Sequence, residues 1–163
     1  KFGPMLMTTG NKSEMSVGYA TIYGDMAGGY NPIKDAYKMT VFAISKWRNA
    51  NKPRLGLGPD GPVMPVNVIE KPPSAELRPD QKDSDSLPDY PQLDAMLHGL
   101  VEEELSVDEV AARGFDRADV ARIERLLCLA EYKRRQAPPG VKLGKRNFGR
   151  DRRYPITNAF RTG

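Results

Sequence analysis

The sequence predicts an α/β fold in which the end of a parallel sheet, with flanking helices, is followed by a helical C-terminal region. Two observations lead to this prediction. Residues 5–9 form a short apolar run that ends before Gly10, which is typical of a buried strand. Residues 91–136 carry apolar side chains at three- and four-residue steps, interrupted by capping and stopping residues, which is typical of consecutive amphipathic helices. Too few other strands are visible to flank the first one, so we expect further chain upstream of residue 1.

A long helix is predicted after the first strand. Asn31 and Pro32 suit the cap and the first position of a helix, which should end near residue 51. Its apolar side chains recur at helical spacing and should face the core: Ile33, Tyr37, Val41, Ile44 and Trp47. The Pro- and Gly-rich segment 52–65 predicts a loop, and a short helix should follow it and end before Pro72.

The second half of the chain predicts a long polar loop, at residues 74–90, and then helices. Three helices are expected. The first covers residues 91–104. The second begins at a capping box of Ser106 and Glu109 and ends at Gly114, and the third runs from Asp116 to about Gln136.

Composition narrows the classes of protein. The 163 residues carry a net charge of +4, and the basic excess lies in residues 133–161. Such a tail indicates an anionic partner, either a nucleic acid or a phosphorylated small molecule. The single cysteine, Cys128, excludes a disulfide framework and favours a reducing compartment, so we expect a cytoplasmic location. No apolar run is long enough to span a membrane, and one histidine gives no basis for a histidine-centred metal site.

Residues 8–14 are the strongest candidates for a site. They combine a strand end, a tight turn, hydroxyl groups, a lysine and a carboxylate. Ligands of open α/β sheets bind outside the carboxyl ends of strands, where hydroxyls and free N–H groups suit phosphate or an adenine edge. A carboxylate there could hold Mg²⁺. An ordinary capped turn also explains these residues and is favoured by their local chemistry alone.

Other candidates also have two interpretations. Lys38 could neutralise a polyphosphate or be a solvated helix residue. The Gly-rich loop around Asp25 could approach a nucleotide closely or simply connect two elements. Residues 74–88 could be a lid that excludes water or a flexible surface loop. The basic residues within 132–135 could bind an anion or complement a helix dipole.

Five segments resemble the NAD synthetase family and occur in the family's order. They are residues 8–14, 23–35, 73–77, 131–136 and 150–158. The loop beyond Ile33 and the closing tail are most similar to the glutamine-dependent branch, in which an N-terminal nitrilase-like amidase domain makes the ammonia. The resemblance implies that residues 1–163 are the C-terminal part of the synthetase (ligase) domain. It also implies a Rossmann-like, ATP pyrophosphatase-type parallel sheet, whose phosphate-loop half would lie upstream together with the amidase domain.

The resemblance further implies a reaction and its partners. The enzyme would be a carbon–nitrogen ligase that amidates deamido-NAD to NAD⁺ at the expense of ATP. An adenylate would form first, with release of pyrophosphate, and ammonia derived from glutamine would then displace AMP. ATP and Mg²⁺ would be required. The protein would be a homo-oligomer built on synthetase dimers, with no membrane or nucleic-acid partner.

The family's site residues fall on named positions of this chain. The ATP contacts implied are Thr9, Lys38 and Ser74, and the deamido-NAD contacts implied are Glu14, Tyr132 and Lys133. Glu14 matches a position that binds Mg²⁺ in the shorter, ammonia-dependent enzymes and deamido-NAD in the longer ones. Tyr132 stands where the family has histidine. A lysine and an aspartate that hold deamido-NAD in the shorter enzymes are replaced here by Ile22 and Gly29, and Asp25 is a candidate substitute.

Two other classes of function remain open at this point. Residues 106–136 have the spacing of a helix-turn-helix, which with the basic tail predicts a DNA-binding module. The second helix of that segment mixes acids with its arginines, whereas a recognition helix usually has a cleaner basic face. A structural subunit that has lost catalysis is the third interpretation, and the presence of Glu14, Lys38 and Lys133 argues against it.

Overall fold

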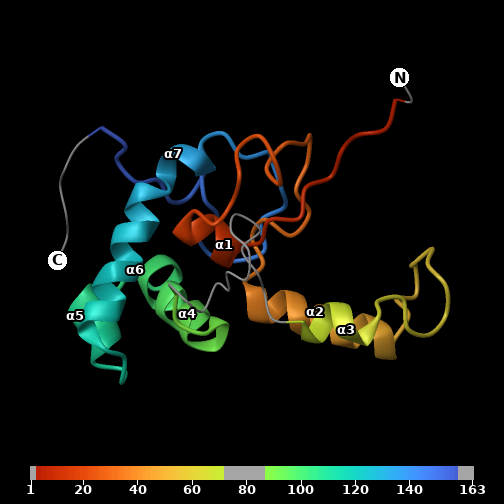
Figure 1. The fold of residues 1–163 in the computed structure, drawn as a ribbon, viewed down its shortest axis with the longest axis horizontal. Helices are drawn as coiled ribbons and strands as arrows, with labels where there is room; N and C mark the ends of the chain where they lie inside the picture. The colour runs from red at the N-terminus through yellow and green to blue at the C-terminus, as the bar shows by residue number, and fades with distance from the viewer. Residues whose placement is uncertain (1–2, 72–86, 158–163) are drawn as a thin grey trace.

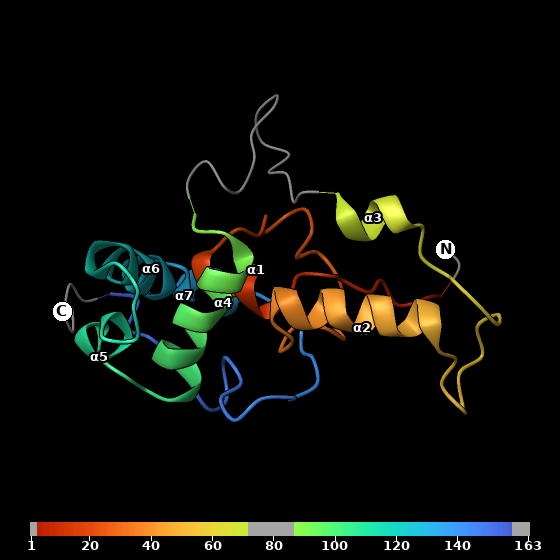
Figure 2. The same cartoon turned by 90° about the horizontal axis from the view of Figure 1, so that it is seen from below.

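The structure is a computed structural model that describes residues 3–71 and 87–157. Its helices, labelled in Figure 1, are α1 (Lys12–Val17), α2 (Lys38–Ala50), α3 (Val66–Glu70), α4 (Tyr90–Leu97), the π-helix η2 (His98–Glu102), α5 (Val107–Ala111), α6 (Arg117–Leu129) and α7 (Glu131–Arg134). Helices α1 and α4 to α7 form the body, and α2 and α3 extend together away from it (Figure 2). Among the described residues, no helix is long and apolar enough to cross a membrane.

The predicted strand is extended but exposed. Met7 forms an isolated parallel bridge with Tyr30, with hydrogen bonds of 2.9 Å from the Thr8 N–H to the Tyr30 carbonyl and from the Gly29 N–H to the Leu6 carbonyl. Within residues 3–71 and 87–157 this bridge does not extend into a ladder. The predicted burial is therefore wrong: residues 5–7 have one paired neighbour and no covering layer, so their side chains are exposed. The parallel sheet stays a prediction.

Helix α2 begins at Lys38 and not at Asn31. The Asn31 side chain accepts a hydrogen bond from the Ile33 N–H (3.2 Å), as a helix cap would, but its amide donates to the Gly10 carbonyl (2.7 Å). The backbone then continues as turns that bury Asp35. The Asn-Pro signal was therefore interpreted wrongly, because the asparagine holds a buried turn together.

The prediction that α2 faces the core is also wrong in this structure. Ile44 and Trp47 are each 52% exposed, and α2 contains no buried residue. The helix lies beside α3 and is tied to the segment before α3, where the Asn49 amide donates to the Met64 carbonyl (2.7 Å). Its apolar stripe is exposed because the arm of α2 and α3 extends away from the helical body (Figure 2).

The core lies among α1, α4, η2, α5 and α6. Its side chains are aliphatic and at helical spacing: Val17, Leu93, Leu97, Val101, Val107, Val110, Val120, Ile123 and Leu127. The predicted capping box is confirmed, since the Glu109 N–H donates to the Ser106 hydroxyl (3.3 Å) and the Ser106 N–H to the Glu109 carboxylate (2.8 Å). Asp116 caps α6 as predicted. These local signals position the helices that carry the site.

Two predicted helices are each divided. The helix expected over residues 91–104 begins as α4 and ends in the π-helical turn η2, a feature that is frequent at functional sites. The helix expected over residues 116–136 is interrupted at Ala130, which separates α6 from α7.

The basic tail packs against the body. Phe148 and Tyr154 are buried in the core cluster, a packing role that the basic composition of the tail did not predict. The tail also contacts the turn before α2: the Asn31 N–H donates to the Pro139 carbonyl (2.8 Å), and a Cβ on Gly140 would lie 2.2 Å from the Asn31 carbonyl oxygen. Residue 140 must therefore lack a side chain for this approach.

Candidate functional site

The turn after the strand places Thr8 and Thr9 differently. Thr9 is exposed, whereas Thr8 is buried and its hydroxyl has no hydrogen-bond partner among the described residues. The Gly-rich loop packs directly on this turn, since a Cβ on Gly28 would lie 2.5 Å from the Thr8 methyl and 2.9 Å from the Leu6 carbonyl oxygen. The glycine thus permits a close approach of two backbones at the site predicted for ATP.

Helix α1 begins with a capping box. The Glu14 N–H donates to the Asn11 side chain (3.0 Å), and the Asn11 N–H donates to the Glu14 carboxylate (3.1 Å). The turn after the strand thus leads directly into a capped helix, and one oxygen of Glu14 serves the helix itself.

Two predicted site residues meet at this point. The Lys38 ammonium donates to the other Glu14 oxygen (2.8 Å), and the two side chains are 16% and 20% exposed. The same ammonium lies 5.2 Å from the Tyr90 ring centroid and 5.6 Å from that of Phe42. Carboxylate and rings thus hold a cation that is still open to solvent, as a group that receives an anionic ligand must be.

Glu14 does not fit a directly bound Mg²⁺ in this arrangement. Its two oxygens face the Asn11 N–H and the Lys38 ammonium, and a second cation beside that ammonium would be repelled. Within the described ranges, no group of three His, Cys, Asp or Glu residues could hold a metal ion.

The residues predicted to contact deamido-NAD lie on α7. The Lys133 ammonium donates to the carbonyls of Gly18 (2.6 Å) and Ala20 (3.0 Å), just beyond the end of α1. Tyr132 is 46% exposed. The Gly18 N–H caps α1 by donating to the Glu14 carbonyl, one helical turn earlier. The Lys133 ammonium, which binds the Gly18 carbonyl, is therefore held one helical turn from Glu14 along α1. Ser74 and most of the predicted mobile loop lie outside the described residues.

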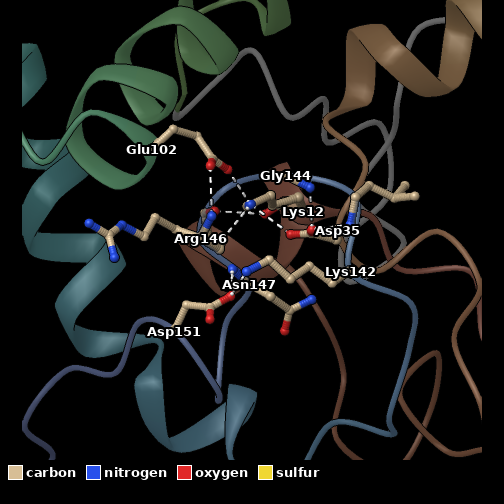
Figure 3. Close-up of polar contacts among 10 residues, drawn as sticks. Lys12, Asp35, Glu102, Lys142, Gly144, Arg146, Asn147 and Asp151 are labelled. Carbon is tan, nitrogen blue, oxygen red and sulfur yellow. Dashed lines mark hydrogen bonds and ion pairs between the residues drawn. The ribbon is translucent and has the colours of Figure 1, made fainter.

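Lys12, the lysine of the candidate segment 8–14, is a buried hub, a role that the sequence did not predict. Its ammonium is fully buried and donates to Asp35 (2.6 Å), to Glu102 and to the Arg146 carbonyl (2.7 Å), as Figure 3 shows. It also lies 5.2 Å from the Tyr37 ring centroid. Two carboxylates offset the cost of burying one cation.

The two carboxylates extend the hub to the tail. Asp35 accepts hydrogen bonds of 2.7 Å from the N–H groups of Leu143 and Gly144, and Glu102 accepts one of 2.9 Å from the Arg146 N–H. Lys12 therefore joins α1 to the turn before α2, to η2 and to the tail. Its partners are up to 134 positions away in the chain, so no local pattern could have identified it.

Arg134 holds the other end of α1. Its guanidinium donates to the carbonyls of Met15 (3.1 Å) and Ser16 (3.0 Å) and to the Glu131 carboxylate (3.0 Å). It also lies 4.6 Å from the Phe148 ring centroid. This buried arginine fixes α7, which carries Tyr132 and Lys133, against the end of α1.

A buried hydroxyl–carboxylate pair lies beside Lys38. The Ser13 hydroxyl donates to Asp94, which also accepts a hydrogen bond from the Met39 N–H (2.8 Å). Burial raises the pKa of Asp94, and the negative charge of Glu14 adds to this rise. The hydrogen bonds from Met39 and Ser13 and the positive charge of Lys38 lower the pKa but do not cancel the effect of burial.

This pKa predicts a pH-dependent stability. A carboxyl whose pKa is raised on folding binds more protons in the folded state, so its contribution to stability falls as pH rises from about 4 through the raised pKa. We expect the difference in unfolding free energy between wild type and Asp94→Asn to fall over this window and then level off. Denaturant unfolding at several pH values measures it. A difference that is flat or rises with pH contradicts the raised pKa.

Comparison with known proteins identifies the family. A model described as NAD synthase matches residues 1–137. The chain belongs to the NAD synthase family. The resemblance that the sequence motifs predicted is thereby confirmed, and the comparisons give no support to the DNA-binding alternative.

Relatives in the NAD synthase family align with nearly the whole chain. The glutamine-dependent NAD(+) synthetase of Rhodobacter capsulatus is 59% identical over 161 residues, which cover 99% of this chain and 29% of the relative. That of Xanthomonas campestris is 54% identical over 160 residues, which cover 98% of this chain and 28% of the relative. The chain thus spans less than a third of the length of these relatives.

Solved structures of the family share the fold of this part of the chain. A glutamine-dependent NAD(+) synthetase from Cytophaga hutchinsonii superimposes with a TM-score of 0.68 at 25% identity, over 95% of this chain and 24% of that one. An NH3-dependent NAD synthetase from Campylobacter jejuni, in complex with nitrate, gives 0.52 at 27% identity, over 79% of this chain and 42% of that one.

Proposed function

We propose that residues 1–163 form the C-terminal part of the synthetase domain of a glutamine-dependent NAD⁺ synthetase. The observation that carries this proposal is the 59% identity to a relative of that name over 99% of the chain. The phosphate-loop half of the domain and a nitrilase-like amidase domain are proposed to lie upstream in the complete protein. They would supply the sheet strands that flank residues 5–9.

The proposed reaction is the ATP-dependent amidation of deamido-NAD. The nicotinate carboxylate attacks the α-phosphate of ATP, which forms an adenylate and releases pyrophosphate. Ammonia from glutamine then displaces AMP and leaves NAD⁺. We also propose that the protein is a homo-oligomer built on synthetase dimers, which its mass in solution would test.

Lys38 is the residue with the clearest proposed role. Two polyanions must meet in this reaction, so a fixed cation is needed to offset their repulsion. The Lys38 ammonium is held by Glu14 (2.8 Å) and lies over the Tyr90 ring (5.2 Å), and an ammonium has three donors, so it can bind a phosphate oxygen without leaving Glu14. Holding the cation in advance reduces the entropy lost when ATP binds.

The remaining contacts are assigned from the family resemblance. The exposed hydroxyl of Thr9 and the side chain of Ser74 are assigned to ATP. Glu14, Tyr132 and Lys133 are assigned to deamido-NAD, with the segment 74–90 closing over the substrates to keep water from the adenylate. No protein ligand is assigned to the Mg²⁺ that the family resemblance implies, since a second cation at Glu14 would be repelled by the Lys38 ammonium.

The activity itself can be measured on the complete protein. It would receive deamido-NAD, ATP and Mg²⁺, with ammonia or glutamine in parallel assays, and NAD⁺ and pyrophosphate would be followed. NAD⁺ from both donors is expected. NAD⁺ from ammonia alone would remove the coupled amidase from the proposal, and a folded protein that forms neither product with either donor would overturn it.

Lys38→Ala is expected to lower kcat/KM for ATP about 10- to 150-fold, the rate equivalent of one lost hydrogen bond to a charged group. Steady-state kinetics with ammonia measure the effect without the amidase. Lys46→Ala is the matched control, because Lys46 is an exposed lysine of the same helix. Equal activity of the two variants would show that Lys38 does not contact ATP.

A further inference from the structure

Helix α2 is capped by other elements of the fold. Its N-cap residue, Tyr37, makes no side-chain hydrogen bond to the helix. The first N–H groups of a helix have no partner within it. Here the Lys38 N–H donates to the Ser13 hydroxyl of α1 (2.9 Å), and the Met39 N–H donates to the Asp94 carboxylate of α4 (2.8 Å).

Ser13 and Asp94 act as one unit in this cap. The Ser13 hydroxyl accepts from Lys38 and donates to the Asp94 oxygen that Met39 does not use. Ser13 is fully buried and Asp94 is 8% exposed, so water does not readily replace either group. The buried pair therefore joins α1, α2 and α4 at the first turn of α2.

This junction has a direct consequence for Lys38. The Lys38 N–H binds Ser13, and the Lys38 ammonium binds Glu14 (2.8 Å), the next residue of α1. Because the Lys38 N–H is held in place, the ammonium can change position only by rotation about the bonds of the Lys38 side chain. A shift of α2 would break the backbone bond and move the cation away from Glu14.

We propose that Ser13 and Asp94 are positioning residues for the Lys38 ammonium, which they act on through the first turn of α2. The inference rests on the proposed function, in which Lys38 binds ATP. Neither residue needs to touch a substrate. Their effect should appear in the binding of ATP and should require Lys38.

The test is a double-mutant cycle in the complete synthetase, with ammonia as the nitrogen donor. Asp94→Ala is expected to raise KM for ATP about tenfold, the equivalent of one lost hydrogen bond, with a smaller change in kcat. Asp94→Asn should recover most of this, since its amide oxygen can still accept from Met39. In the Lys38→Ala background, Asp94→Ala should have little further effect on KM.

Asp116→Ala is the matched structural control. Asp116 caps α6 by accepting hydrogen bonds from the Ala118 N–H (2.9 Å) and the Asp119 N–H (3.1 Å), so its loss should weaken a helix of the body without changing KM for ATP. Ser13→Ala removes one hydroxyl only and serves if Asp94→Ala does not fold. It should raise KM in the same direction.

The outcomes distinguish a failure of the positioning role of Ser13 and Asp94 from a failure of the ATP contact of Lys38. Suppose that Lys38→Ala lowers kcat/KM, and that Asp94→Ala raises KM for ATP by the same factor in the Lys38→Ala background as in the wild type. Asp94 then acts independently of Lys38, and the positioning role is wrong. If Asp94→Ala and Asp116→Ala change KM equally, the effect is one of general stability and the role is again wrong. Unchanged kinetics of Lys38→Ala would remove the ATP contact itself, and the positioning role with it.

Discussion

Replacing Lys12 with methionine is expected to lower the free energy of unfolding by about 3–5 kcal/mol. The Lys12 ammonium is fully buried and donates to Asp35, to Glu102 and to the Arg146 carbonyl. Methionine fills a similar volume but carries no charge, so two buried carboxylates would face each other without a cation. Denaturant unfolding followed by circular dichroism measures the loss.

Two controls separate the ion cluster from general effects. Adding Asp35→Asn and Glu102→Gln to Lys12→Met should recover much of the loss, because neutral amides need no counter-charge. Lys46→Met, at an exposed position of α2, should change stability by no more than about 0.5 kcal/mol. If Lys12→Met cost as little as Lys46→Met, the buried cluster would not stabilise the fold.

Arg134→Met is expected to cost a comparable amount, about 3–5 kcal/mol. The substitution leaves the buried Glu131 carboxylate without the guanidinium and removes the hydrogen bonds to the Met15 and Ser16 carbonyls at the end of α1. It also removes the cation beside the Phe148 ring. Denaturant midpoints and slopes of wild type and variant give the difference.

The matched control for Arg134 is Arg135→Met on the same segment. Arg135 binds the other oxygen of Glu131 (2.6 Å), but its side chain is 41% exposed and its loss leaves the buried Arg134–Glu131 pair intact. It should therefore cost much less. Arg134→Lys should recover only part of the stability, because an ammonium cannot reproduce the planar fork of the guanidinium. Equal losses in the Arg134 and Arg135 variants would contradict the role of the buried fork.

The features that the sequence predicted correctly are those with local causes. The capping box at Ser106 and the cap at Asp116 each act within one helical turn, so residue identity and spacing suffice to find them. The pairing of Glu14 with Lys38 across 24 positions was not predicted from spacing. Both residues were nevertheless singled out, because the family resemblance implies ligand contacts at both positions.

The features that the sequence missed depend on distant partners. Asn31 has the local chemistry of a helix start, but the Gly10 carbonyl, 21 positions away, takes its amide and stabilises a turn. The structural roles of Lys12, Asp94 and Arg134 were not predicted, since their buried partners come from other segments of the chain. The apolar stripe on α2 has the spacing of a core-facing helix, but spacing alone does not show whether another element packs against it.

The large sequence separation between Lys12 and its partners has a consequence during synthesis of the protein. Lys12 leaves the ribosome 134 residues before Arg146. At about 5–20 residues per second, this is an interval of about 7–27 s. An ammonium is costly to bury before its partners are present, so α1 must remain hydrated until the tail emerges. A single lysine thus makes docking of α1 wait for translation of the segment around Arg146, and a chain terminated before that segment stays open to chaperones and proteases.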